Sequence, residues 1–214
     1  TRFPFPVIGG DVLRIYYICK YLSKYHNITL LSLTNSKISL EDIPPSFRKY
    51  FKDIHIVYKS KISSAFNCML NIFGKKPLQS YYYKSIRFEN LFNQLLVHND
   101  IVLCHLIRLA YLCQNISKPV ILEFTDAISL NYSRLDLKLD KFFLRKLIYK
   151  FDQKKVRNFE IAVCNMVSCK SFVSKVDVTY LSNFNKCFSN SIVAPCGVNL
   201  QKYKFSSNRF SNEI

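Results

Sequence analysis

The sequence is poor in glycine, in acidic residues and in long apolar runs, and each shortage excludes something. Only four of the 214 residues are glycine, so we expect glycine where the backbone needs a positive φ or a ligand must come close. No apolar run reaches the roughly 18 residues of a transmembrane helix. There is no GxxxxGK[ST] loop, no GxSxG elbow and no metal-ligand spacing among the histidines, so neither these sites nor a bound metal is predicted.

Acidic residues are outnumbered by basic ones, 14 against 31, which gives a net charge of +17. Such an excess predicts an anionic partner: nucleic acid, a lipid surface or a phosphorylated ligand. The basic residues are spread along the chain and are densest at 59–61 and 138–157. This diffuse pattern favours a membrane surface over sequence-specific nucleic-acid reading, with simple solubilisation as the alternative.

The eight cysteines form no CxxC pair, and several, such as Cys104 and Cys164, lie within apolar runs. Free cysteine behaves in this way as a small buried hydrophobe. The pattern therefore predicts a reducing, cytosolic setting in preference to a disulfide framework.

Apolar periodicity predicts helices and strands that alternate along the chain. This alternation is typical of an α/β fold with a doubly wound parallel sheet. Helices are expected at 11–25, 63–73, 81–98, 107–115, 140–163 and 176–184, and strands at 27–33, 54–58, 100–105, 120–124, 166–173 and 191–194.

Ligands bind such sheets at the carboxyl ends of the strands. Chemically useful residues follow several of the predicted strands, so we expect them on one edge of the sheet. They are Gly9 and Gly10, His105, Thr125 and Asp126, Ser174, and residues 195–199.

Four segments together resemble the family-4 glycosyltransferases of the GT-B type, in particular those of bacterial polysaccharide assembly. They occur in the family's order and span nearly the whole chain. The segments are RFPFPVIGGD at 2–11, DIVLCHLIR at 100–108, VILEFTDAIS at 120–129 followed by NYSR, and FVSKVD at 172–177 with VAPCGVN at 193–199.

The resemblance implies that residues 1–199 form the N-terminal, acceptor-side Rossmann-like domain of a GT-B fold. Its first strand is expected to be largely missing, since only residues 1–3 remain for it. Residues 200–214 would start the linker toward a donor-binding domain outside this sequence. The family's Asn-Gly-Val-Asp turn stands here as Cys196-Gly197-Val198-Asn199, which leaves Gly197 a backbone role.

The same resemblance implies a retaining, hexosyl-type glycosyltransferase of cell-surface polysaccharide or lipopolysaccharide biosynthesis. The donor is a nucleotide sugar bound as substrate, and no cofactor is implied. The acceptor is a lipid-linked molecule or a saccharide. The enzyme would be cytoplasmic, peripheral at the inner face of an anionic membrane, without a specific nucleic-acid partner. The present fragment alone is expected to be inactive.

Within this scheme Gly9 and Gly10 would offer backbone N–H groups to a donor phosphate at a helix N-terminus, unless they only form a tight turn. Arg14 would add charge there or stay solvated. Asp126 is the candidate catalytic base or acceptor-orienting group, with an N-cap of a helix near Ile128 as the alternative.

His105 is a candidate ligand contact or a structural residue. Arg108 and Arg134 are candidates for binding a lipid-linked phosphate, or for pairing with a carboxylate. Ser174 would line the interdomain cleft, and Glu160 is expected to be structural or near the acceptor. The apolar stripe within 138–155 is expected to pack in the core, while the basic face of the same segment could meet anionic lipid.

Two other functions compete with this one. A non-catalytic basic α/β module that binds anionic lipid or nucleic acid would explain the same charge. A nucleotide-dependent epimerase or dehydrogenase would need a GxGxxG fingerprint, which is absent from the sequence.

Overall fold

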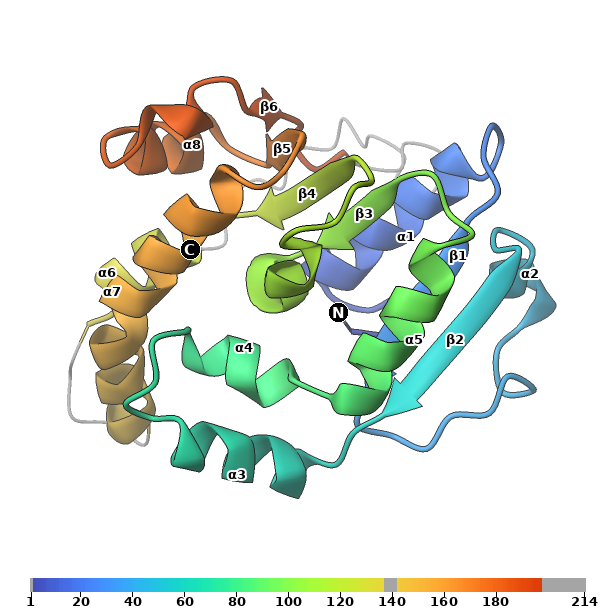
Figure 1. Cartoon of the computed structure of the whole chain (residues 1–214), viewed down its shortest axis with the longest axis horizontal. Helices are drawn as coiled ribbons and strands as arrows, with labels where there is room; N and C mark the ends of the chain where they lie inside the picture. The colour runs from blue at the N-terminus through green and yellow to red at the C-terminus, as the bar shows by residue number, and fades with distance from the viewer. Residues whose placement is uncertain (1, 137–141, 198–214) are drawn as a thin grey trace, which may run out of the picture.

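The computed structural model describes residues 2–136 and 142–197, and its helices and strands alternate as predicted (Figure 1). The predicted boundary of the first domain at 199 and the predicted linker at 200–214 lie outside the described residues. The elements are α1 (Gly10–Leu22), β1 (Thr29–Thr34), α2 (Pro45–Arg48), β2 (Asp53–Tyr58), α3 (Lys61–Leu70), α4 (Leu78–Tyr83), α5 (Ile86–Leu96), β3 (Val102–His105), the 3₁₀-helix η1 (Ile107–Cys113), β4 (Val120–Thr125), α6 (Ile128–Ser133), α7 (Phe143–Cys164), β5 (Cys169–Phe172), α8 (Lys175–Ser182), the 3₁₀-helix η2 (Lys186–Phe188) and β6 (Ile192–Val193).

One predicted helix, at 81–98, is divided between α4 and α5. Lys84 is extended, with φ −61° and ψ 126°, and Ser85 then begins a new helix. The Ser85 hydroxyl accepts a hydrogen bond from the Phe88 amide at 3.4 Å, which is the usual role of an N-cap serine. Periodicity alone does not register such a break, because the apolar spacing continues across it.

All paired strands of the described chain are parallel, which confirms the mixed α/β class. They form two sheets, however, and not the single sheet that alternation suggested. The first has the order β1-β2 and the second the order β3-β4-β5-β6. Alternation predicts that strands run parallel but does not fix which strands are neighbours.

The start of the chain pairs with the smaller sheet. Arg2 forms an isolated parallel bridge with Leu33 of β1, and the Phe3 amide donates to the Leu33 carbonyl at 3.0 Å. The turn at residues 4–9 then leads into α1, so this helix begins beside the carboxyl end of β1. This places Gly9 and Gly10 at the edge where the sequence predicted them.

Helices cover both faces of the sheets, because alternate strand residues enter different apolar clusters. On one face of the smaller sheet Leu33 and Val57 pack with Phe88 of α5, and on the other Leu30 and Ile54 lie in a cluster with α1 and α2. In the larger sheet one side of β4 enters the main core with α6, α7 and α8, through Val120, Leu122 and Phe124. The intervening residue Glu123 therefore faces away from that core, toward α1.

Most of the cysteines behave as expected from their apolar surroundings, but one pair does not. Cys19 and Cys113 are free and buried, and Cys104 is free and half-buried. Cys164, at the end of α7, forms a disulfide with Cys187 of η2, with the Cα atoms 6.3 Å apart. The expectation of reduced cysteines therefore fails at this pair, where the fold brings together two thiols 23 residues apart in sequence.

Candidate functional site

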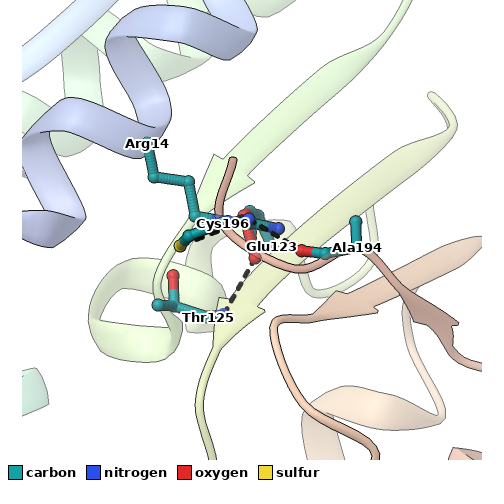
Figure 2. A network of polar contacts seen from close by, with 5 residues as sticks. All are labelled: Arg14, Glu123, Thr125, Ala194 and Cys196. Atoms are coloured by element: carbon teal, nitrogen blue, oxygen red, sulfur yellow. Dashed lines mark hydrogen bonds and ion pairs between the residues drawn. The ribbon is translucent and has the colours of Figure 1, made fainter. Parts of the chain in front are cut away.

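A buried ion pair joins α1 to the end of β4 (Figure 2). Arg14 Nε lies 2.7 Å from Glu123 Oε2, with the side chains 8% and 1% exposed. Arg14 Nη1 also donates to the Ala194 carbonyl at 2.8 Å, beyond β6. Arg14 is thus not the solvated residue that one prediction allowed. Burial alone would lower its pKa, but the bond to Glu123 outweighs this and raises the pKa above its usual value.

Thr125 closes β4 in a strained backbone conformation. Its φ is +68°, a region that β-branched residues rarely adopt. The Thr125 amide donates to Glu123 Oε1 at 2.9 Å, and its carbonyl accepts from the Val173 amide at 2.8 Å. The register between β4 and β5 shifts at this point. Glu123 therefore holds the turn that presents the next residue, Asp126.

Asp126 lies half-buried between β4 and α6. Its Oδ2 accepts from Asn131 Nδ2 at 2.5 Å. Burial raises the pKa of this carboxyl above its usual value, and Asp177 acts in the same direction, while Asn131 and Arg108 oppose the shift. The helix-cap alternative for Asp126 is wrong, because Ala127 is the N-cap of α6 and its amide donates to Asp177 Oδ1 at 2.9 Å.

His105 ends β3 close to the start of α1. Burial lowers its pKa to about 3, with Arg108 acting in the same direction and Asp11 opposing. The imidazole is therefore neutral near pH 7. Arg108 stacks over the Tyr83 ring with its Cζ 5.1 Å from the centroid. His105, Arg108 and Asp126 thus form one group at the carboxyl edge of β3 and β4, with Asp11 beside His105.

The four glycines differ in whether the backbone conformation or the surrounding space requires glycine. Gly9 has a φ of +96° and requires glycine, whereas a Cβ at Gly10 or Gly197 would meet nothing within 4 Å. A Cβ at Gly74, which was not predicted as special, would lie 2.8 Å from Tyr81 Cζ. Backbone geometry therefore accounts for Gly9 and Gly74, while for Gly10 and Gly197 the other expected reason, the close approach of a ligand, stays a prediction. Gly10 remains available for the close approach of a ligand.

The other predicted site residues are placed less closely. Ser174 is the N-cap of α8, where its hydroxyl accepts from the Val176 amide at 3.0 Å. Arg134 is exposed at the C-cap of α6, the opposite end of that helix from Asp126, about 9 Å along its axis. Gly197 is exposed three residues beyond Ala194. Whether these residues touch a ligand stays a prediction.

Glu160 is a fully buried carboxylate of α7 that holds the start of α6. Its Oε2 accepts from the Ser129 hydroxyl at 2.5 Å and its Oε1 from the Ser129 amide at 3.2 Å. Burial raises the pKa of Glu160 to about 7, against the opposing bonds from Ser129. The structure thus gives Glu160 a supporting position beneath the Asp126 turn, as one of the two predictions for it required.

Two residues or surfaces that matter here were missed from the sequence. Glu123 was not singled out, although a lone glutamate inside the apolar run VILEF signals a buried charge that needs a partner. The outward apolar face of α3 was also missed. It could have been found from its helical spacing, which places apolar residues at 62, 66, 69, 70 and 73.

Two helices present apolar side chains to solvent, and this corrects the expected core packing of the stripe within 138–155. On α7 the exposed residues are Leu144, Leu147, Ile148 and Phe151, and on α3 and the turn after it they are Ile62, Phe66, Met69, Leu70 and Phe73. We call these nine residues the α3–α7 surface. One hydrogen bond joins α7 to the turn after α3, from Lys155 Nζ to the Ile72 carbonyl at 2.6 Å, and a second joins α7 to the start of α4, from the Leu78 amide to Asp152 Oδ2 at 2.9 Å. In Figure 1, α7 lies at the left of the molecule and α3 at the bottom.

Within residues 2–136 and 142–197, no cluster of three His, Cys, Asp or Glu side chains is arranged to hold a metal ion. In the same part of the chain no helix has the length and apolar character needed to span a bilayer.

Comparison with known proteins yields no match: no family model, no curated protein and no solved structure is similar to this chain. What the fold and the site define is therefore the class, a Rossmann-like α/β protein with parallel strands and a polar group at their carboxyl edge.

Proposed function

We propose that the chain is the acceptor-side part of a retaining, nucleotide-sugar-dependent hexosyltransferase of cell-surface polysaccharide assembly. The observation that carries this proposal is the strained turn at Thr125, which fixes Asp126 at the carboxyl edge of the sheet. Strain in the backbone persists where the surrounding structure compensates for it, and such positions gather at functional sites. The resemblance of the four sequence segments gives the turn its chemical interpretation.

In this proposal His105, Arg108 and Asp126, which we call the edge group, act on the substrate through charge and through hydrogen bonds. Asp126 orients the acceptor hydroxyl, and its raised pKa suits a group that also takes up a proton. His105 is neutral and adds no charge, and Arg108 supplies a positive charge that acts on both Asp126 and His105. Gly10, with open space above it, lets a phosphate approach the first amides of α1.

The α3–α7 surface supports a peripheral position on an anionic membrane for the same enzyme. Large apolar side chains there are strongly exposed, for example Leu144 at 73% and Phe73 at 88%. Exposed basic residues lie among them, including Lys75, Lys76 and Arg145. Apolar stripes flanked by cations are the composition of helices that lie in a membrane interface. We place this surface on the cytoplasmic leaflet, where lipid-linked acceptors would be presented.

The test is to incubate the natural full-length protein with membranes and a panel of nucleotide sugars, and to measure nucleotide release and sugar incorporation. We expect one donor to be turned over, and Asp126→Asn to reduce kcat at least tenfold. Ser39→Ala, in an exposed loop away from the edge group, serves as the control. Absence of turnover with every donor, in a folded protein that binds the membranes, would overturn the transferase proposal.

The alternative function, a non-catalytic basic module on anionic lipid, is favoured by the α3–α7 surface alone. It shares the membrane contact and differs in lacking chemistry. This alternative would be selected if the protein binds vesicles but turns over no donor, and if Asp126→Asn leaves the vesicle binding unchanged.

A further inference from the structure

A recess lies beside the carboxyl ends of β1 and β2. It borders the group of His105, Arg108 and Asp126, because Tyr83 of its lining carries the stacked Arg108 side chain. The recess is partly open to solvent and has a volume of about 410 Å³, within the range of small-molecule sites. Its lining combines cations, hydroxyls and aromatic rings from distant parts of the chain. The residues that matter here are Arg2, Lys59, Lys61, Ser64, Tyr82 and Tyr83.

Within residues 2–136 and 142–197, no acidic side chain lies closer than 3.6 Å to a cation of this recess. That distance joins Arg2 Nη1 to Asp11 Oδ2, and the Arg2 side chain is 59% exposed. Lys61 is exposed, and Lys59 is buried, with its Nζ donating a hydrogen bond to the Lys84 carbonyl. Among the described acidic groups, Glu89 is the one whose charge acts on Lys59, and its carboxylate already accepts the Tyr111 hydroxyl at 2.8 Å.

Ser64 adds an observation of a different kind. It is 1% exposed and its Oγ has no hydrogen-bond partner in the described chain. A buried hydroxyl without a partner costs free energy unless something bonds to it. Ser64 lines the recess one turn into α3, so a bound molecule would satisfy it.

The start of α3 borders the recess, since Lys61 and Ser64 of this helix line it. Lys61 is the first residue of this ten-residue helix, and Ser60 caps only the Ser63 amide, at 3.1 Å. Helix N-termini with flanking cations favour phosphate groups, because the amides and the dipole both attract negative charge. Tyr82 and Tyr83 also line the recess, with ring centroids 5.1 Å apart, and add an aromatic surface to the lining that holds the cations.

We propose that this recess binds the phosphate of a sugar phosphate ester, with Arg2, Lys61 and Ser64 on the phosphate and Tyr82 and Tyr83 against the sugar ring. The phosphate group comes either from a free sugar phosphate or from a lipid-linked one. That the phosphate ester carries a sugar rests on the proposed function. The recess would hold the phosphorylated acceptor, and the group at Asp126 would perform the transfer.

The experiment is a calorimetric titration of the protein with inorganic phosphate and with a hexose phosphate, and a sedimentation assay with vesicles that carry a lipid-linked hexose phosphate. We expect saturable binding of hexose phosphate. The single variants Lys61→Gln and Arg2→Gln should each weaken this binding about tenfold, because each removes a charge-assisted contact. Lys24→Gln, the same change on an exposed residue at the far end of α1, should bind as the parent does. Ser64→Ala should weaken binding without loss of the folded state.

Binding to the vesicles alone, with the same dependence on Lys61 and Arg2, assigns the lipid-linked source and upholds the proposal. Hexose phosphate binding that is unchanged in Lys61→Gln and Arg2→Gln, or no binding of any phosphate, overturns it. No nucleotide sugar is present in these assays, so their failure is distinct from a failure of donor turnover.

Discussion

At the scale of single residues, Gly9 and Gly10 separate a backbone requirement from an available space. Gly9→Ala should lower the free energy of unfolding by about 2 kcal/mol, because alanine resists a φ of +96°. Gly10→Ala should change it by less than about 0.5 kcal/mol, since its Cβ meets nothing. Chemical denaturation of both variants measures this difference. Equal losses in the two would show that the turn does not have the described conformation.

Thr125 allows the strain itself to be tested. Thr125→Gly should raise the free energy of unfolding by about 1 kcal/mol, because glycine tolerates a φ of +68°. Thr125→Ala, which keeps the strain and loses the hydroxyl, is the matched control and should not be stabilised. If the turn positions Asp126, sugar transfer by the full-length protein should fall in Thr125→Gly even as stability rises. A glycine variant that is both less stable and fully active would contradict this account.

Residue identity also shows what could be predicted from sequence. The strand-end rule placed His105 and Asp126 at one edge, and the structure agrees. It could not predict that Arg14 would be bound to Glu123, because that contact spans 109 positions of sequence and depends on how α1 packs across the sheet. The sequence also could not predict the positive φ of Thr125, because threonine rarely adopts this conformation and its presence does not indicate it.

At the scale of elements, we expect the contact between α6 and α7 to depend on pH through Glu160. A carboxyl whose pKa is about 7 in the folded state and about 4.5 when unfolded binds an extra proton in the fold between those values. The free energy of unfolding should therefore fall by about 3 kcal/mol as pH rises from 4.5 to above 7.

Glu160→Gln keeps an acceptor and a donor for Ser129 without a titrating charge, so this part of the pH dependence should disappear and stability at pH 8 should increase. Urea unfolding at several pH values measures both effects. Glu41→Gln, at an exposed position, is the control and should retain the slope of the parent. An unchanged slope in Glu160→Gln would mean that this carboxyl is already charged within the fold.

The α3–α7 surface makes a prediction at the same scale. Leu144→Ser and Phe73→Ser should each weaken sedimentation with anionic vesicles about tenfold, because each removes an apolar side chain from the interface. Their melting temperatures should stay within a few degrees of the parent's, since both side chains are exposed. Val97→Ser, with the same exposure as Leu144, lies at the end of α5 and should not affect binding. Equal effects of all three substitutions would show non-specific attraction.

Helical spacing was sufficient to predict α7 but not which way its apolar stripe faces. The C-terminal half buries Val156 and Val163, as a core helix should, while the N-terminal half exposes Leu144 and Leu147. An amphipathic pattern has the same period in both cases. Only the neighbours decide whether the stripe is covered, and those neighbours are remote in sequence.

At the scale of the whole molecule, the Arg14–Glu123 pair connects α1, the end of β4 and the segment after β6. Arg14→Met should lower the free energy of unfolding by about 3–5 kcal/mol, because it leaves Glu123 charged and buried without a partner. The double variant Arg14→Met/Glu123→Gln should recover most of this loss, since no bare charge remains. Denaturant titration of the three proteins tests this. No recovery in the double variant would assign the loss to packing of the arginine stem.

The arrangement of strands was the least predictable feature at this scale. Strand positions followed from apolar runs, but the division into β1-β2 and β3–β6 rests on hydrogen bonds between remote segments. The bridge between Arg2 and Leu33 is an example. A pairing of one residue with one other residue produces no repeating sequence pattern from which it could be predicted.

The position of α3 has a consequence for how a ligand would be found. The helix begins at the recess with Lys61 and carries exposed apolar residues along its length. A protein held at the bilayer by this helix would meet a lipid-linked phosphate by diffusion in two dimensions. Confinement of this kind raises the effective concentration of the second partner to about the millimolar range. A recess of low intrinsic affinity would then be filled on the membrane and remain open in solution.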